Sequence, residues 1–99
     1  VAGQIQKEIQ ELEKITVDFE NPKKLDKEIR ALNAPLQQEI FRALDLLENF
    51  PHIQNCKKLQ GKDNGFRIKV RDARILFTFN KNARKITVYK IGPRKDIYR

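Results

Sequence analysis

The sequence predicts an α+β fold, in which a helical hairpin packs on a small, mainly antiparallel four-stranded sheet and an extra helix precedes both. Two periodicities carry this prediction. Apolar residues recur every three or four positions between residues 22 and 50, which is typical of helices. They alternate with polar residues between residues 66 and 91, which is typical of strands. Since 99 residues suffice for one modest core, we expect a single domain over residues 1–99.

Two short elements are predicted at the start of the chain. Residues 1–14 form a helical extension, because their apolar residues share one helical face. Alternation of apolar and polar residues over residues 15–20 then indicates a strand with one buried side. We therefore assign the core of the fold to residues 15–99. The apolar positions of the extension are Ile5, Ile9 and Leu12.

The helical hairpin is predicted next, with a connection so short that its two helices are antiparallel. Asn21 and Pro22 are typical of the N-cap and the first position of a helix, where proline loses no hydrogen bond. The first helix stops near Asn33-Ala-Pro35, and the second ends at Phe50-Pro51. The apolar faces are formed by Leu25, Ile29 and Leu32 in the first helix and by Leu36, Ile40, Leu44 and Leu47 in the second.

A meander of three antiparallel strands is predicted over residues 66–71, 74–79 and 85–91, because the turns between them are short. We place the first turn at Asp72-Ala73, so that Arg71 lies opposite Arg74. One face of this hairpin is then apolar and covered by the helices. Its pairs are Phe66 with Phe79, Ile68 with Phe77, and Val70 with Ile75.

The opposite face of the meander is cationic. Its cations repel one another unless an anion lies between them, and no acidic residue on the same strands offsets them. The arrangement favours binding of a phosphate backbone over a merely solvated face, which is the simpler alternative. The predicted residues of this face are Arg67, Lys69, Arg71 and Arg74, with Leu76, Thr78, Thr87 and Tyr89 around them.

Charge is divided unevenly along the chain. Residues 1–50 carry 7 Lys and Arg against 10 Asp and Glu, whereas residues 51–99 carry 14 against 3. The net charge of +8 therefore conceals one strongly basic half, which makes nucleic acid the first partner to consider. Arg94, Lys95 and Tyr98 add to it after the last strand. Neighbouring cations would make the Tyr98 phenol a usable general base, or Tyr98 is a hydrophobic anchor for the chain end.

Metal and membrane functions are not expected. Cys56 and His52 are the only residues of their kinds, and two ligands do not make a metal site. No apolar run approaches the ~20 residues that cross a bilayer, and the first residues lack the apolar stretch of a signal peptide. We therefore expect a cytoplasmic protein that uses no metal and makes no membrane contact.

Four segments of the basic half occur in a familiar order. They are Lys58-Leu59-Gln60-Gly61, Phe66-Arg-Ile-Lys-Val70, Arg74-Ile-Leu-Phe77, and Ile91-Gly-Pro-Arg94 followed by Tyr98. With this order and spacing, the chain resembles the RelE/ParE toxin superfamily over roughly residues 15 to 99. The resemblance implies a RelE-like fold, a toxin of a type II toxin-antitoxin system, and a cognate antitoxin protein as partner.

Members that resemble RelE are messenger-RNA interferases, which cut the codon in the ribosomal A site without a metal or cofactor. In that scheme the ribose 2′-hydroxyl attacks, and a cyclic phosphate remains. The resemblance implies that Tyr98 or Lys69 would take the 2′-hydroxyl proton. Arg74 would hold the scissile phosphate, and Arg94 would stabilise charge or serve the leaving oxygen. The remaining RNA-binding residues that we expect are Lys57, Lys58, Arg67, Arg71 and Lys95.

Two other functions are alternatives. A ParE-like member of the same fold would poison DNA gyrase and do no chemistry itself, and a non-catalytic RNA-binding domain would need the cationic face without Tyr98. RNA cleavage is favoured because one set of side chains suits it and has no evident use in a gyrase contact. That set is Arg67, Lys69, Arg74, Arg94 and Tyr98.

Overall fold

The structure is a computed structural model that describes residues 14–61 and 64–97. The helix predicted over residues 1–14 lies, apart from Lys14, outside the described residues. In chain order the elements are β1 (Thr16–Phe19), α2 (Pro22–Arg30), α3 (Ala34–Asp45), the 3₁₀ helix η1 (Leu46–Asn49), β2 (Cys56–Lys58), β3 (Gly65–Val70), β4 (Ala73–Asn80), β5 (Lys85–Pro93) and α4 (Arg94–Ile97).

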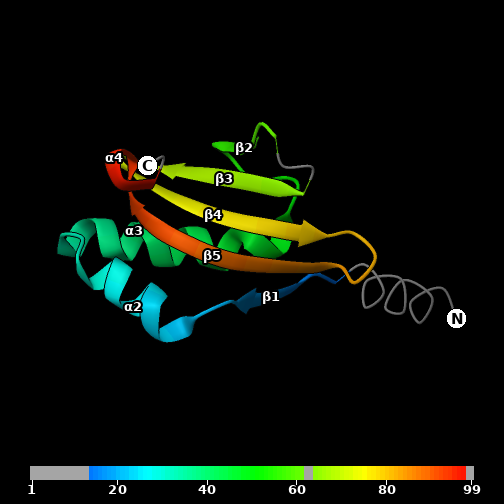
Figure 1. The fold of residues 1–99 in the computed structure, drawn as a ribbon, viewed down its shortest axis with the longest axis horizontal. Coiled ribbons are helices and arrows are strands. Elements are labelled where there is room, and N and C mark those ends of the chain that lie inside the picture. Colours follow the sequence, from blue (N-terminus) through cyan, green and yellow to red (C-terminus); the bar gives the residue numbers. More distant parts are fainter. Residues whose placement is uncertain (1–13, 62–63, 98–99) are drawn as a thin grey trace, which may run out of the picture.

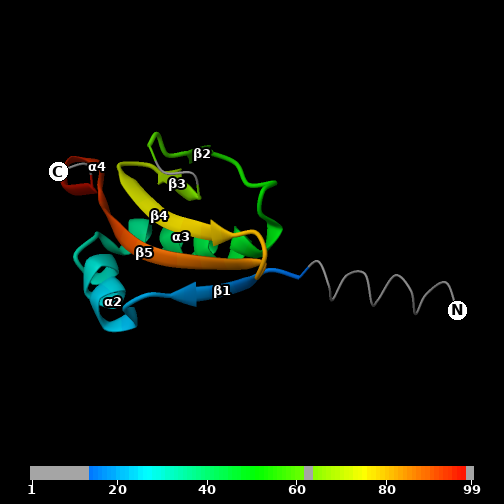
Figure 2. The same ribbon diagram turned by 45° about the vertical axis from the view of Figure 1, so that its right-hand side comes forward.

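The strands form one sheet in the order β1-β5-β4-β3-β2, with β1 parallel to β5 and every other pair antiparallel. The helices α2 and α3 lie on one face of this sheet, and α4 lies at the end where β3 stops and β4 begins (Figures 1 and 2). The predicted α+β class and helical hairpin are confirmed. The predicted strand number was wrong by one, because β2 is a three-residue Cys-Lys-Lys segment without alternation.

The core lies between the helical hairpin and the sheet. Phe50, which follows η1, has its ring centroid 4.9 Å from that of Phe66, 5.7 Å from that of Phe77 and 4.7 Å from that of Phe79. These contacts close one end of the core with edge-on and tilted aromatic pairs. The largest fully buried side chains are Phe77, Ile40, Leu47, Ile75, Ile86, Ile91 and Val88. No helix in the described part of the chain is long and apolar enough to cross a membrane.

Asparagine caps begin both long helices. The Asn21 side chain accepts a hydrogen bond from the Lys24 backbone N–H at 3.2 Å, as the sequence predicts for the start of α2. Asn33 does the same for α3, accepting from the Leu36 N–H at 3.0 Å. Each cap satisfies an amide that has no partner within the helix, and Asn33 thereby fixes where the connection between the two helices ends.

The β3–β4 hairpin is displaced by two residues from the predicted register. Val70 lies opposite Ala73 and Ile68 opposite Ile75, so the turn is Arg71-Asp72 and not Asp72-Ala73. A shift of two leaves every strand side chain on its predicted face, because the side-chain period of a strand is two. The apolar face of the hairpin therefore meets the helices as predicted, although its individual pairs differ.

A bulge in β5 determines which residues of β5 lie beside the start of β4, next to the β3–β4 turn. Tyr89 is the additional residue, and the pairs that flank it are Leu76 with Lys90 and Phe77 with Val88. A bulge shifts the alternation of a strand by one position. As a result Gly92 lies directly opposite Arg74 and the chain reaches α4 from that point.

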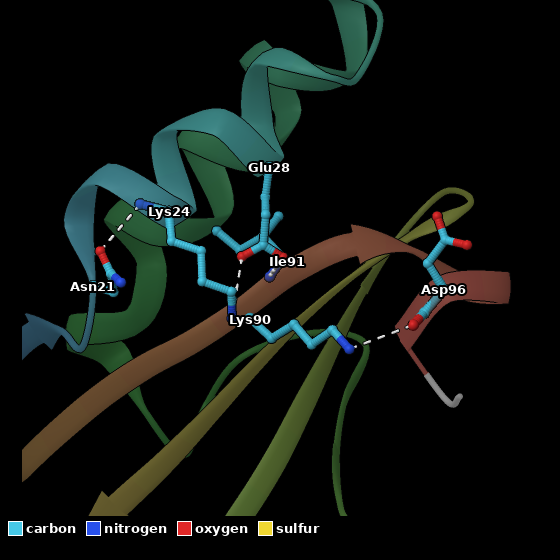
Figure 3. Close-up of polar contacts among 6 residues, drawn as sticks. All are labelled: Asn21, Lys24, Glu28, Lys90, Ile91 and Asp96. Atoms are coloured by element: carbon cyan, nitrogen blue, oxygen red, sulfur yellow. Dashed lines mark hydrogen bonds and ion pairs between the residues drawn. The ribbon is translucent and has the colours of Figure 1, made fainter.

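Side chains attach α2 and α4 to β5 where β1 no longer accompanies it (Figure 3). β1 pairs with β5 only as far as Val88. Beyond that point the Glu28 carboxylate, from α2, accepts a hydrogen bond from the Ile91 backbone N–H at 3.4 Å. Lys90 Nζ donates to the Asp96 carbonyl at 3.4 Å, which connects β5 with α4. These contacts hold both helices at the sheet end where the candidate site lies.

Candidate nucleic-acid interface

Cations from three strands share the sheet face opposite α2 and α3. Lys57 of β2 lies opposite Arg67 of β3, and Lys69 lies opposite Arg74 of β4. Directly paired residues lie on the same face, and so do residues two apart on one strand. These four predicted residues therefore belong to one face. Lys58 is opposite Phe66, on the other face, and is exposed at the edge of the sheet.

A hollow of about 590 Å³ lies at the end of this face, and four cations line it. They come from β3, the β3–β4 turn, β4 and α4, so only the folded chain brings them together. The four cations outnumber the carboxylates beside them, Asp72 in the lining and Glu39 at Arg71, and this surplus of positive charge favours binding of a phosphate group. The lining residues are Asn33, Leu36, Lys69, Arg71, Asp72, Arg74 and Arg94.

Arg74 is buried, which corrects the expectation that it is open to solvent. Its side chain lies on the predicted face but is only 7% exposed. Its Nη1 donates to the Arg71 carbonyl at 3.0 Å and to the Ala73 carbonyl at 2.9 Å. Two backbone acceptors therefore fix the direction of the guanidinium at the wall of the hollow.

The short helix α4, which the sequence analysis did not predict, lies on the strand next to Arg74. Ile97 is 5% exposed, and its Cδ1 lies 3.8 Å from where a Cβ on Gly92 would be. Because Gly92 is the residue opposite Arg74, α4 covers this part of the sheet. Leu76, expected on an open face, is likewise only 6% exposed.

Arg71 forms an ion pair that the strand pattern did not predict. Its Nε lies 2.7 Å from Oε2 of Glu39, which comes from α3. The backbone of Arg71 has a positive φ of 52°, so this residue belongs to the turn and does not continue the alternation of β3. The expectation that Arg71 shares the open face with Arg67 and Lys69 was therefore wrong. Glu39 neutralises part of its charge and holds it at the edge of the hollow.

Arg94 and Lys95 are both exposed at the start of α4. The Arg94 backbone N–H donates to the Asp72 carbonyl at 2.7 Å, which joins α4 to the β3–β4 turn. A separate depression of about 600 Å³ beside α4 adjoins this contact and is lined by Asp72, Pro93, Arg94 and Lys95. The predicted general base Tyr98 lies outside the described residues.

Sequence reasoning missed four residues around the site: Asn33, Leu36, Glu39 and Asp72. Asp72 carries a signal in the sequence, since it follows the basic residues 67–71, but a turn alone also explains an aspartate at this position. Glu39 gave none, because it lies 32 positions from Arg71 and looks like an ordinary polar residue of a helix. Contacts between distant segments leave no periodic pattern.

Cys56 lies beside Arg67 at the start of β2. Burial raises the pKa of its thiol, and the nearby charge of Arg67 opposes this effect. The thiol is therefore a poor candidate for a nucleophile. Among residues 14–61 and 64–97, no group of three or more His, Cys, Asp or Glu side chains is arranged to hold a metal ion.

Comparisons with known proteins identify the fold. No family model matches the sequence, and no curated protein matches it either. A chain in the archaeal RelE-RelB complex from Pyrococcus horikoshii has a TM-score of 0.68 and 22% identity, with 82% of this chain and 96% of that chain covered.

Two further solved structures give the same result. A chain in the RelB-RelE antitoxin-toxin complex from Methanococcus jannaschii has a TM-score of 0.66 and 22% identity, over 82% of this chain and 94% of that one. The isolated E. coli RelE toxin has a TM-score of 0.64 and 22% identity, over 80% and 83%. The protein therefore has the fold of the RelE toxins, as its sequence predicts.

Proposed function

We propose that this protein is the toxin of a type II toxin-antitoxin system and that it stops translation by cutting messenger RNA on the ribosome. The observation that carries the proposal is the hollow in which Lys69, Arg71, Arg74 and Arg94 converge. The RelE fold supports the same function. A site of this composition binds one phosphate of an RNA strand. Lys57 and Arg67, which lie opposite each other on the same face, bind the neighbouring phosphates.

The reaction is an internal transfer of the phosphoryl group. The ribose 2′-oxygen attacks phosphorus, the bond to the 5′-oxygen breaks, and the products are a 2′,3′-cyclic phosphate and a 5′-hydroxyl end. One base must take the 2′-hydroxyl proton, and one acid must give a proton to the leaving 5′-oxygen. We assign the base to Tyr98 or to Lys69, which is exposed and lies on the cationic face.

Arg74 and Arg94 take different parts in this proposal. Arg94 is exposed and can approach the phosphate. There it stabilises the charge that develops in the transition state, or it donates a hydrogen bond to the leaving 5′-oxygen. Arg74 is held by two backbone carbonyls, so its guanidinium is oriented before RNA arrives. Such a preorganised cation holds the scissile phosphate without reorganising during the reaction.

The antitoxin is proposed to cover the cationic face with a segment that is acidic and apolar. Acidic side chains would neutralise Lys57, Arg67 and Lys69, whose charges otherwise attract RNA. A complex in which the antitoxin avoids this face would contradict occlusion as the mode of inhibition.

The experiment is cell-free bacterial translation followed by primer extension on the messenger. The unaltered protein should produce cuts within the reading frame. Arg94→Ala should lower the cutting rate by about 100-fold or more, since it removes a group that acts in the transition state. Lys69→Ala should have an effect of the same size if Lys69, and not Tyr98, is the base. Lys81→Ala is the matched control, because Lys81 is an exposed lysine in the turn at the other end of the sheet. It should cut at the original rate.

Other outcomes separate the alternatives. Cutting of the same messenger in the absence of ribosomes would contradict ribosome dependence and leave RNA cleavage intact. Bound but uncut messenger would identify a non-catalytic RNA-binding domain. Intact messenger together with double-strand DNA breaks in cells would identify a gyrase poison. Tyr98→Phe assigns the base, because cutting that survives this change transfers the role to Lys69.

A further inference from the structure

A second hollow, of about 660 Å³, lies next to the cationic one and has a different chemistry. It lies between α3, the loop before β2 and the end of β3. Its volume is within the range of roughly 300–1,000 Å³ of small-ligand pockets. Its lining includes Ala43 of α3, His52, Ile53 and Gln54 of the loop, and Lys69 and Val70 of β3.

The hollow exists because β2 is shorter than β3. β2 begins at Cys56, which pairs with Ile68, so among the described elements the last residues of β3 have a strand, β4, on one side only. The Lys69 backbone N–H instead donates a hydrogen bond to the Asn55 carbonyl at 3.0 Å. Asn55 has a positive φ of 63°, so the loop turns there and its residues 52–55 line the hollow opposite α3.

Charged residues line two sides of this hollow, Glu39 and Arg42 from α3 and Lys69 and Arg71 from β3 and its turn, and the uncharged remainder suits a flat group with polar edges. Ala43, Ile53 and Val70 are half-buried and form apolar walls. His52 and Gln54 are exposed at the rim and offer a ring to stack on and an amide to form hydrogen bonds. A nucleobase has these properties, because it presents two apolar faces and an edge of donors and acceptors.

The two hollows share a boundary. Lys69 and Arg71 line both of them, and the 2.7 Å ion pair of Arg71 with Glu39 stands where they meet. When a ligand places an anionic group in the cationic hollow, the atoms bonded to that group lie at the entrance of the hollow between α3 and β3. A nucleotide joins a phosphate and a base through one ribose, which matches this juxtaposition.

We propose that the hollow between α3 and the end of β3 is a nucleobase subsite, which receives the base attached to the phosphate held in the cationic hollow. The inference rests on the proposed function and adds the part of the site that reads the RNA. Gln54 and His52 are the residues whose polar atoms would distinguish one base from another.

The test uses the whole protein and compares nucleoside 5′-monophosphates with ribose 5-phosphate, which carries the phosphate and lacks the base. Binding is followed by NMR titration. His52 is the only histidine of the chain, so its imidazole signals report on this hollow without overlap. At least one nucleotide should shift the His52 signals and bind about tenfold more tightly than ribose 5-phosphate, as expected when a base gains stacking contacts.

Two variants make the assignment specific to the hollow. Ala43→Leu adds side-chain volume inside it and should remove the advantage of the nucleotide, with binding of ribose 5-phosphate unchanged. Ala83→Leu is the matched control, because Ala83 is exposed in the β4–β5 turn. Gln54→Ala alters an exposed loop side chain that leaves the core intact, and it should change the ranking of the nucleotides.

The outcomes separate this inference from the proposed function. Equal binding of nucleotides and ribose 5-phosphate, without a shift of the His52 signals, would refute the base subsite and leave the phosphate site standing. Failure of both ligands to bind would contradict the phosphate site itself and the subsite with it. A nucleotide advantage that Ala43→Leu and Gln54→Ala both leave untouched would place the base elsewhere and also refute the inference.

Discussion

Arg74 offers a quantitative test of how the candidate interface is built. Its side chain is 7% exposed, and Nη1 donates to two backbone carbonyls at 3.0 and 2.9 Å. A hydrogen bond that involves a charged group contributes about 1.5–3 kcal/mol. Taking the lower value for each bond, Arg74→Ala should lower the free energy of unfolding by about 3 kcal/mol. An exposed arginine would change it by at most about 0.5 kcal/mol.

The assay is urea unfolding followed by far-ultraviolet circular dichroism, since the chain contains no tryptophan. With a urea dependence of about 1–3 kcal/mol per molar, the midpoint should fall by roughly 1–3 M. Arg94→Ala is the matched control, because Arg94 is exposed and its truncation removes the same charge. Arg74→Lys should recover only part of the loss, because an ammonium does not reproduce the planar fork of a guanidinium.

The result that would refute this reasoning is equal stability of Arg74→Ala and Arg94→Ala. Relief of repulsion in a chain of net charge +8 affects both variants alike, so it cannot produce a difference between them. Equality would mean that Arg74 faces solvent, as the strand pattern alone suggested.

Three further predictions concern the core, an ion pair and the single cysteine. Phe77 is fully buried, so Phe77→Ala should lower the free energy of unfolding by about 3–5 kcal/mol in the urea assay. Phe41 is 50% exposed, and Phe41→Ala should cost about 1 kcal/mol or less; equal losses would contradict the assignment of the core. Lys85, whose Nζ lies 2.9 Å from Asp18, holds the pKa of that carboxyl below its usual 3.8, mainly through their hydrogen bond. A carboxyl with a depressed pKa stabilises the fold above its unfolded pKa and loses this contribution as the pH falls, so Asp18→Asn should flatten the stability profile below about pH 4. An NMR titration midpoint of Asp18 at or above 3.8 would contradict the ion pair. Burial raises the pKa of the Cys56 thiol, so iodoacetamide at pH 8 should modify the folded protein more slowly than the urea-unfolded protein, and equal rates would show that the thiol is not shielded.

Much of the fold was predictable from the sequence because its main elements are amphipathic. The spacing of Leu25 and Ile29 marked α2, and the alternation in residues 66–71 marked the hairpin with its correct faces. Two elements were not predictable in this way. β2 has three residues and α4 has four, so neither is long enough to display a period. The hairpin register was also missed, because shifts by two residues preserve the pattern of faces.

The candidate site was predictable in its composition and not in its arrangement. The sequence by itself determined that the second half of the chain is basic and that Arg67 and Lys69 share a face, since charge and strand period are local properties. Only the tertiary structure decided that Arg74 is buried, that Glu39 pairs with Arg71, and that a second hollow adjoins the cationic one. The physical reason is that each of these features depends on contacts between segments far apart in the chain. Such contacts are set by how the elements pack, which no local pattern of residues records.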